Sequence, residues 1–201
     1  MGNGLVQDGT RALQSARTHA ATLATFVGLL WLVHVANVLL GGALLAWGIH
    51  PRTMSGLLGI FFAPFLHGST LHLVVNTISF VVFGALMRFR HRNDFVVVAG
   101  VGALTSGLGA WLFGAPGSVH IGASGVIFAF LGFLMARGIF ERSVSSIVLS
   151  VLVTWFFGSM LWGLLPAAGA AISWQAHLFG LLGGILCASV LGGELRRRRR
   201  R

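Results

Sequence analysis

Residues 122–140 read GASGVIFAFLGFLMARGIF, an apolar run interrupted by one charged residue near its end. About 20 predominantly apolar residues are needed for a helix to cross a bilayer, so this run predicts a transmembrane helix. Further runs of the same kind lie on both sides of it, at residues 21–47, 70–87, 95–113, 145–165 and 172–193. The sequence therefore predicts an all-α, polytopic membrane protein whose six transmembrane helices form one bundle.

The composition favours lipid as the surrounding medium. Hydrophobic residues make up 56% of the chain and charged residues only 9%, with a mean hydropathy of +0.88, whereas soluble domains carry about 25% charged residues. The formal net charge is +10, but the arginines are spread between the apolar runs and form no nucleic-acid-binding face. Cys187 is the single cysteine, so no disulfide can form within the chain. The sequence contains no metal-ligand set and no cofactor fingerprint.

The connectors between the apolar runs are of two kinds that alternate strictly. One kind is basic, at residues 11–17, 88–92, 137–142 and 196–201, and the other kind carries the prolines, at residues 50–66, Pro116 and Pro166. Short arginine-rich loops stay in the cytoplasm, so we expect a plasma-membrane protein with both termini cytoplasmic. The opening residues lack the order of a cleaved signal peptide, which predicts that the first span remains as an anchor.

Three parts follow from this arrangement. Residues 1–20 are expected to form a cytoplasmic tail, residues 21–193 the six-span core, and residues 194–201 a basic cytoplasmic tail that contacts anionic membrane lipid. The second, fourth and sixth spans then all run from outside to inside. Their first turns share one depth near the external face.

Four polar side chains fall at that shared depth. His72 and Asn76 are one helical turn apart in the second span, Ser124 opens the fourth span, and His177 opens the sixth. Polar groups inside a span are costly and mark either function or a paired partner. A serine nucleophile needs a base and donors for the oxyanion, and this set supplies both.

The carboxylates decide which catalytic arrangement is possible. All four acids, Asp8, Asp94, Glu141 and Glu194, are assigned to the inner side, so a Ser-His-Asp triad is excluded and a dyad of Ser124 and His177 remains. His72, Asn76 and the backbone N–H of Ser124 are then the candidate oxyanion donors.

Small residues accompany these polar groups. Gly122 and Gly125 leave the backbone beside Ser124 uncovered, and Gly180 and Gly184 allow the helix of His177 to approach its neighbour closely. His120 lies at a water-facing turn and is expected to be solvated.

Three motifs together resemble the rhomboid family. They are His72-xxx-Asn76 in the second span, Gly122-Ala-Ser124-Gly125 at the start of the fourth, and Ala176-His177-xx-Gly180-xxx-Gly184 in the sixth. The resemblance implies a six-helix bundle with a water-filled cavity open to the outside. It also implies cleavage of other membrane proteins within or beside their transmembrane helices, so the partners would be transmembrane protein substrates and not nucleic acid.

Carried over by position, the resemblance makes Ser124 the nucleophile, His177 the base, and His72 and Asn76 the oxyanion donors. His67 matches a histidine that the family often has near the start of the second span, in a supporting role. Phe128 stands where the family often has a tyrosine that stacks on the base, so its ring can orient His177 but offers no hydroxyl. Residues 56–68, GLLGIFFAPFLHG, lack the Trp-Arg pair that is common in the family.

Two other functions compete with the protease. An inactive rhomboid-like protein would hold membrane clients without cutting them, but it would normally have lost the serine or the histidine. A small permease would show pseudosymmetric halves and broken helices near the membrane centre, and this chain shows no repeat. The sequence does not indicate the substrate or the oligomeric state.

Overall fold

The computed structural model describes residues 2–87, 94–166 and 172–199. Within these residues, six helices are long and apolar enough to cross a membrane, which confirms the predicted all-helical six-span architecture. The helices run, in chain order, α1 (Gly2–Leu39), η1 (Ala43–Trp47), α2 (Met54–Phe62), η2 (Ala63–Phe65), α3 (Thr70–Met87), α4 (Asp94–Phe113), α5 (Ser124–Glu141), α6 (Val144–Phe157), η3 (Gly158–Leu164) and α7 (Trp174–Arg199).

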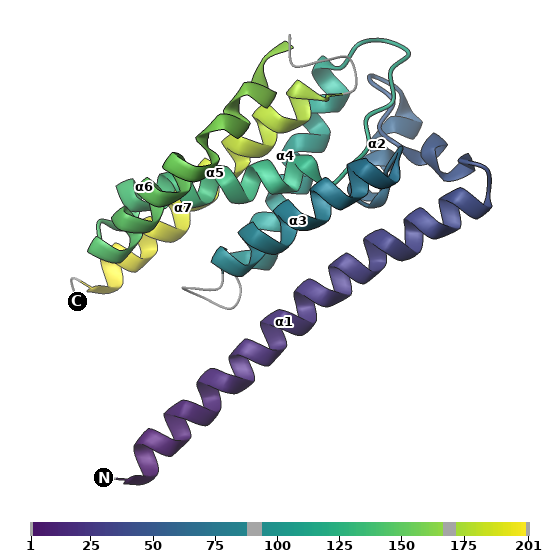
Figure 1. Cartoon of the computed structure of the whole chain (residues 1–201). Coiled ribbons are helices and arrows are strands. Elements are labelled where there is room, and N and C mark those ends of the chain that lie inside the picture. The colour runs from purple at the N-terminus through teal and green to yellow at the C-terminus, as the bar shows by residue number, and fades with distance from the viewer. Residues whose placement is uncertain (1, 88–93, 167–171, 200–201) are drawn as a thin grey trace.

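The helix α5 forms the centre of the bundle. Its spanning window is 78% buried, whereas the windows of the other spans are 17–39% buried. Figure 1 shows α3 lying between α1 and the group formed by α5, α6 and α7. The start of α1 and the end of α7 lie on the same side of the molecule (Figure 1), as an even number of spans requires.

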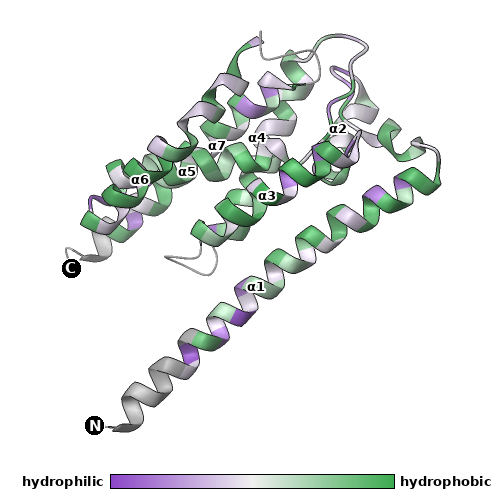
Figure 2. Ribbon diagram, viewed as in Figure 1, coloured by the Kyte–Doolittle hydropathy of each residue, from purple (hydrophilic) through white to green (hydrophobic). Residues whose placement is uncertain are grey.

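The outer surface of the bundle is apolar. Figure 2 shows hydrophobic residues along most of each spanning helix, and large side chains such as Leu32, Val151 and Trp155 are more than half exposed. In a soluble protein such a surface would drive association. In this chain it matches the hydrocarbon of a bilayer.

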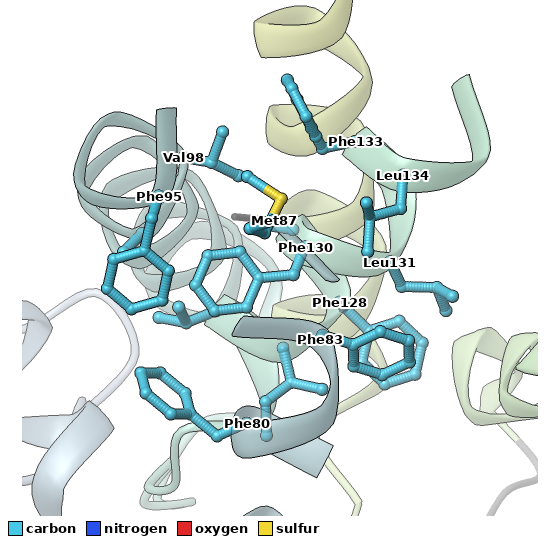
Figure 3. Close-up of a cluster of buried hydrophobic side chains, with 14 of the residues drawn as sticks. Phe80, Phe83, Met87, Phe95, Val98, Phe128, Phe130, Leu131, Phe133 and Leu134 are labelled. Carbon is cyan, nitrogen blue, oxygen red and sulfur yellow. The ribbon is translucent and has the colours of Figure 1, made fainter. Parts of the chain in front are cut away.

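An aromatic cluster joins α3, α4 and α5 in the core (Figure 3). The rings of Phe95 and Phe130 stack with centroids 5.1 Å apart, and Phe80 contacts both at 5.9 and 5.6 Å. Offset and edge-to-face ring pairs add about 0.5–1.5 kcal/mol each beyond the burial of their area. This cluster fixes α3 against the central helix.

Glycines bring α5 and α7 into contact. A Cβ atom on Gly180 would lie 2.1 Å from the carbonyl oxygen of Gly125, and one on Gly184 would lie 1.9 Å from that of Ala129. Neither position could carry a side chain without separating the two helices. The small residues therefore bring the start of α7, with His177, close to the start of α5, with Ser124.

Some predicted boundaries need correction. The first span was expected to continue to residue 47, but α1 ends at Leu39, because Gly41 and Gly42 adopt left-handed backbone angles (φ of 64° and 90°). The helices α1 and α7 continue through the expected boundaries after residues 20 and 193, and the division into two tails and a core stays a prediction. The basic connector at residues 88–92 lies outside the described residues.

The connector between α1 and α3 contains helices that the sequence pattern did not indicate. Thr53 caps α2 by accepting a hydrogen bond from the Gly56 N–H. The connector is held to the loop before α5 by a β-bridge in which Ile49 and His120 exchange backbone hydrogen bonds of 2.9 and 3.0 Å. Arg52 donates to the Leu112 carbonyl, and Trp111 donates to the Thr53 carbonyl. These contacts anchor the connector although residues 56–68 lack a Trp-Arg pair.

Candidate active site

Ser124 is the first residue of α5, where a sharp turn leads into the helix. Gly122 has a φ of +112°, a conformation that residues with a side chain rarely adopt, and its N–H donates to the Ala63 carbonyl at 2.8 Å. The N–H groups in the first turn of a helix have no partner within the helix and carry partial positive charge. The backbone N–H of Ser124 belongs to this turn.

The side chains of Ser124 and His177 are in hydrogen-bond contact. The Nε2 atom of His177, in the first turn of α7, lies 2.8 Å from Oγ of Ser124. His177 is 8% exposed, so the contact is largely shielded from solvent. The contact joins residues from two different spans, α5 and α7.

The second nitrogen of His177 determines the tautomer. Its Nδ1 atom lies 3.0 Å from the carbonyl oxygen of Gly163 in η3. Because a carbonyl oxygen can only accept, Nδ1 carries the proton and donates it, and Nε2 of the neutral ring is left to accept from the Ser124 hydroxyl. This is the tautomer that a general base needs.

The ring of Phe128 supports the same histidine. Phe128 lies one turn after Ser124 on α5, and its ring stacks on that of His177 with centroids 4.1 Å apart and planes at 12°. The stacked ring and the Gly163 carbonyl together restrict the imidazole in rotation and in tilt. Neither group can exchange a proton with the histidine.

His72 and Asn76 converge on the space beside Gly122. A methyl group placed on Gly122 would lie 2.8 Å from Nε2 of His72 and 3.4 Å from Nδ2 of Asn76. This space therefore exists only because residue 122 has no side chain. It adjoins the start of α5, so two side chains and a helix N-terminus surround it.

His67 is hydrogen-bonded to Asn76 behind this space. The Nδ2 atom of Asn76 lies 3.0 Å from Nε2 of His67, and Nδ1 of His67 lies 3.3 Å from the Phe65 carbonyl. Burial, reinforced by the nearby His72, lowers the pKa of His67 to about 4. The neutral ring donates through Nδ1 and accepts from the Asn76 amide through Nε2, so it fixes the orientation of that amide.

A small cavity of about 20 Å³ adjoins Ser124. Its polar lining includes Ser106, His120 and Ser173, and Gly122 and Gly125 form part of its wall. A volume of this size holds about one water-sized group.

His120 is not solvated as expected. Its Nε2 lies 2.9 Å from the Ser118 hydroxyl and its Nδ1 lies 2.7 Å from the Ser173 hydroxyl. Ser173 in turn accepts from the Ala176 N–H. The prediction of a solvated side chain was wrong because the bridge between Ile49 and His120 carries the loop before α5 over the start of α7.

Carboxylates lie far from the dyad in the described part of the chain. Glu141 ends the helix that Ser124 begins, and a rise of 1.5 Å per residue puts the two ends of α5 roughly 26 Å apart. Glu141 pairs with Arg137 at its own end of the helix. Within the described residues, no three His, Cys, Asp or Glu side chains could hold a metal ion together.

Comparison with known proteins identifies the family. The Rhomboid domain model matches residues 54–194. The chain belongs to the rhomboid family. An uncharacterised protein of Mycobacterium tuberculosis is 40% identical over 185 residues, which cover 89% of this chain and 77% of the relative. The rhomboid protease GlpG of Yersinia enterocolitica is 31% identical over 186 residues, which cover 88% of this chain and 65% of the relative.

A more partial match is the putative rhomboid protease YdcA of Bacillus subtilis, 29% identical over 122 residues that cover 60% of each chain. Rhomboid family membership makes this chain a multi-pass membrane protein and a serine-type intramembrane endopeptidase.

The sequence pattern missed two backbone groups of this site. The Gly163 and Ala63 carbonyls hold His177 and Gly122, but a carbonyl has no signature in a sequence. Gly163 lies in an apolar segment, and the only signal there is the absence of its side chain. A Cβ atom at Gly163 would lie 3.2 Å from His177 Nδ1.

Proposed function

We propose that this rhomboid protein cleaves membrane-anchored proteins with a dyad of Ser124 as nucleophile and His177 as general base. The observation that carries the proposal is the 2.8 Å contact between Ser124 Oγ and His177 Nε2, in the tautomer selected by the Gly163 carbonyl. The four acids of the chain leave no carboxylate for a triad in the described part of the bundle, and the Gly163 carbonyl occupies the place of the third group.

In the proposed mechanism, Oγ of Ser124 attacks the carbonyl carbon of the scissile peptide bond while its proton passes to Nε2 of His177. The carbonyl oxygen becomes an oxyanion in the space beside Gly122, where it accepts from His72, Asn76 and the Ser124 N–H. The protonated His177 then gives its proton to the leaving amine, and the C–N bond breaks to leave an acyl-enzyme. Water, deprotonated by His177, attacks the ester and restores Ser124.

The substrate is proposed to be a transmembrane helix that unwinds near its external end. Ser124 opens its span, so the cut falls within about one turn of that end. A peptide bond inside a helix cannot present its carbonyl to a nucleophile, because its backbone is enclosed by the helix. The small cavity beside Ser124 favours a small side chain next to the cleaved bond.

The orientation belongs to the same proposal. The positive-inside rule applied to the basic connectors puts both termini in the cytoplasm, the dyad toward the external face, and the chain in the plasma membrane. Transmembrane proteins are then the substrates, and no nucleic acid or cofactor takes part.

A serine-directed fluorophosphonate probe tests the dyad directly. Purified protein in micelles is labelled, digested and mapped by mass spectrometry, with Ser124→Ala and Ser106→Ala as paired variants. We expect the label on Ser124 alone, its loss in Ser124→Ala, and its retention in Ser106→Ala. Labelling that persists in Ser124→Ala would overturn the assignment of the nucleophile, and a wild-type protein that takes no label would favour the client-holding or permease alternatives.

A further inference from the structure

A second cavity lies behind the candidate active site, on the side of the bundle where α1 faces α4. Its volume is about 300 Å³, and every residue that lines it is apolar. Phe26 and Leu30 of α1 form one wall, residues 96–104 of α4 form the opposite wall, and Ala123 and Val126 close the back. The roof is the α2–η2 segment, from Ile60 to Phe65.

The cavity opens sideways, within the membrane-spanning depth. Phe61, Val96 and Leu104 border it and are 70%, 56% and 49% exposed. Gly100 lines the cavity without a side chain, and a Cβ atom there would point into open space, with nothing within 4 Å. A glycine inside a helix costs roughly 0.5–1 kcal/mol relative to alanine, so the open space beside Gly100 comes at a cost to the stability of α4.

The lining decides the chemistry of the occupant. An unwound peptide would bring amide groups that find no hydrogen-bond partner among apolar side chains, at a cost of several kcal/mol each. A transmembrane helix is about 10–12 Å wide, too wide for a cavity of about 300 Å³. An apolar cavity of about 150 Å³ binds one benzene molecule, so this one accommodates on the order of a dozen carbon atoms.

We propose that this cavity between α1, α4 and the α2–η2 segment binds an acyl chain of a membrane phospholipid. The chain enters from the bilayer between Val96 and Leu104 and fills the space under Phe61 and Phe65. The surrounding bilayer supplies this ligand at high local concentration.

The occupant supports the segment that holds the candidate oxyanion site. The Ala63 carbonyl in the roof accepts from Gly122 N–H, and the Phe65 carbonyl accepts from His67, which orients Asn76. Filling the cavity therefore stabilises the Gly122 turn and the Asn76 amide. This step rests on the function proposed above.

The binding test uses proteoliposomes that contain a phospholipid with a diazirine in its acyl chain. Crosslinked peptides are mapped in the Ser124→Ala background, so that the result does not depend on catalysis. We expect crosslinks enriched at Phe61 and Leu104 over the exposed α4 residue Val97, which does not line the cavity. In Gly100→Phe the added ring fills the cavity, and these crosslinks should fall several-fold, whereas Val97→Phe should leave them unchanged.

Equal labelling of Phe61 and Val97, or labelling that Gly100→Phe does not reduce, would refute an acyl-chain site. Crosslinking of the same residues by a photoreactive transmembrane substrate in place of the lipid would refute the choice of occupant.

The coupling has a separate readout. Added phospholipid should raise both Tm and kcat of the wild-type protein in micelles, because a ligand that binds only the folded state stabilises it. In Gly100→Phe, whose added ring already fills the cavity, phospholipid should raise Tm and kcat less. In Val97→Phe it should raise them as much as in the wild type. If Tm rose but kcat did not change, the lipid site would stand and its link to the oxyanion side chains would be rejected. If the crosslinks were intact but the protein showed no activity at all, the proposed function would be contradicted instead.

Discussion

The rings of Phe128 and His177 lie almost parallel, 12° apart, with centroids separated by 4.1 Å. Phe128 belongs to α5 and His177 to α7, so the stack fixes the imidazole of His177 relative to α5. Together with the Gly163 carbonyl it leaves His177 one orientation, with Nε2 toward Ser124.

Phe128→Leu should therefore lower kcat by about 2-fold to 10-fold, because a ring pair contributes about 0.5–1.5 kcal/mol beyond its buried area. Phe133→Leu is the matched control, since Phe133 is a buried ring on the same helix and makes no contact with His177 among those described. Both variants should lose thermal stability, and only Phe128→Leu should lose turnover of a transmembrane substrate. An equal fall of kcat in both variants would show that Phe128 contributes only to packing and does not orient His177.

Gly163→Ala tests the carbonyl that selects the tautomer. The added Cβ would lie 3.2 Å from both His177 Nδ1 and Phe128 Cζ, so η3 must shift and lengthen the hydrogen bond to Nδ1. A hydrogen bond contributes about 0.5–1.5 kcal/mol, so we expect kcat to fall by about 2-fold to 10-fold with little change in KM. Gly158→Ala is the control in the same segment, because a Cβ there meets nothing within 4 Å. Equal kcat in the two variants would show that the Gly163 carbonyl does not position the base.

The sequence predicted the spans well because hydrophobic length is a property of the residues themselves. The alternation of basic and proline-bearing connectors also predicted which spans run in the same direction, and hence that Ser124 and His177 could meet. The structure brings their side chains to 2.8 Å.

What the sequence could not predict depends on backbone groups and on long-range pairing. The connector containing α2 and η2 is short and interrupted by prolines, so its hydrophobicity did not distinguish helix from loop. His120 was predicted to be solvated because no residue near it in the sequence indicates its hydrogen bond with Ser173, which is distant in the sequence. The acyl-chain cavity has no motif, since any apolar residues could line it.

Stability in acid should depend on His67. Its pKa is about 4 in the folded protein and about 6.5 in the unfolded chain, so between these values the unfolded state binds more protons. Stability must then rise with pH in this window and be lost as pH falls from about 6.5 to about 4. His67→Gln, which has no titratable group and keeps an acceptor for the Asn76 amide, should show a shallower fall of Tm over the same window. An identical slope in both proteins would show that His67 does not titrate as inferred.

Orientation in the membrane can be measured with single cysteines in a Cys187→Ala background. Ala115 and Ser145 are both exposed and lie at opposite ends of the bundle, Ala115 in the connector between α4 and α5 and Ser145 in the first turn of α6. Ala115→Cys should react with an impermeant thiol reagent from outside intact cells, and Ser145→Cys should react only after lysis. The reverse pattern would place the dyad at the cytoplasmic face and refute the proposed topology.

Oxyanion binding and structural hydrogen bonding at His72 and Asn76 differ in magnitude. An interhelical hydrogen bond in a membrane protein contributes about 0.6 kcal/mol on average, whereas removal of one oxyanion donor costs about 2.7–4 kcal/mol of transition-state stabilisation. The Ser124 N–H and the remaining side chain survive each single change. We therefore expect His72→Ala and Asn76→Ala each to lower kcat by about 10-fold or more with little change in KM.

Thr77→Val is the control beside Asn76 on α3, because it removes only the hydrogen bond from the Trp31 side chain of α1. It should lower Tm slightly and leave kcat unchanged. If His72→Ala and Asn76→Ala behaved in the same way as Thr77→Val, the two side chains would be interhelical hydrogen-bonding groups. The oxyanion would then be held by the backbone at the start of α5, where the N–H groups of the first turn are the remaining donors.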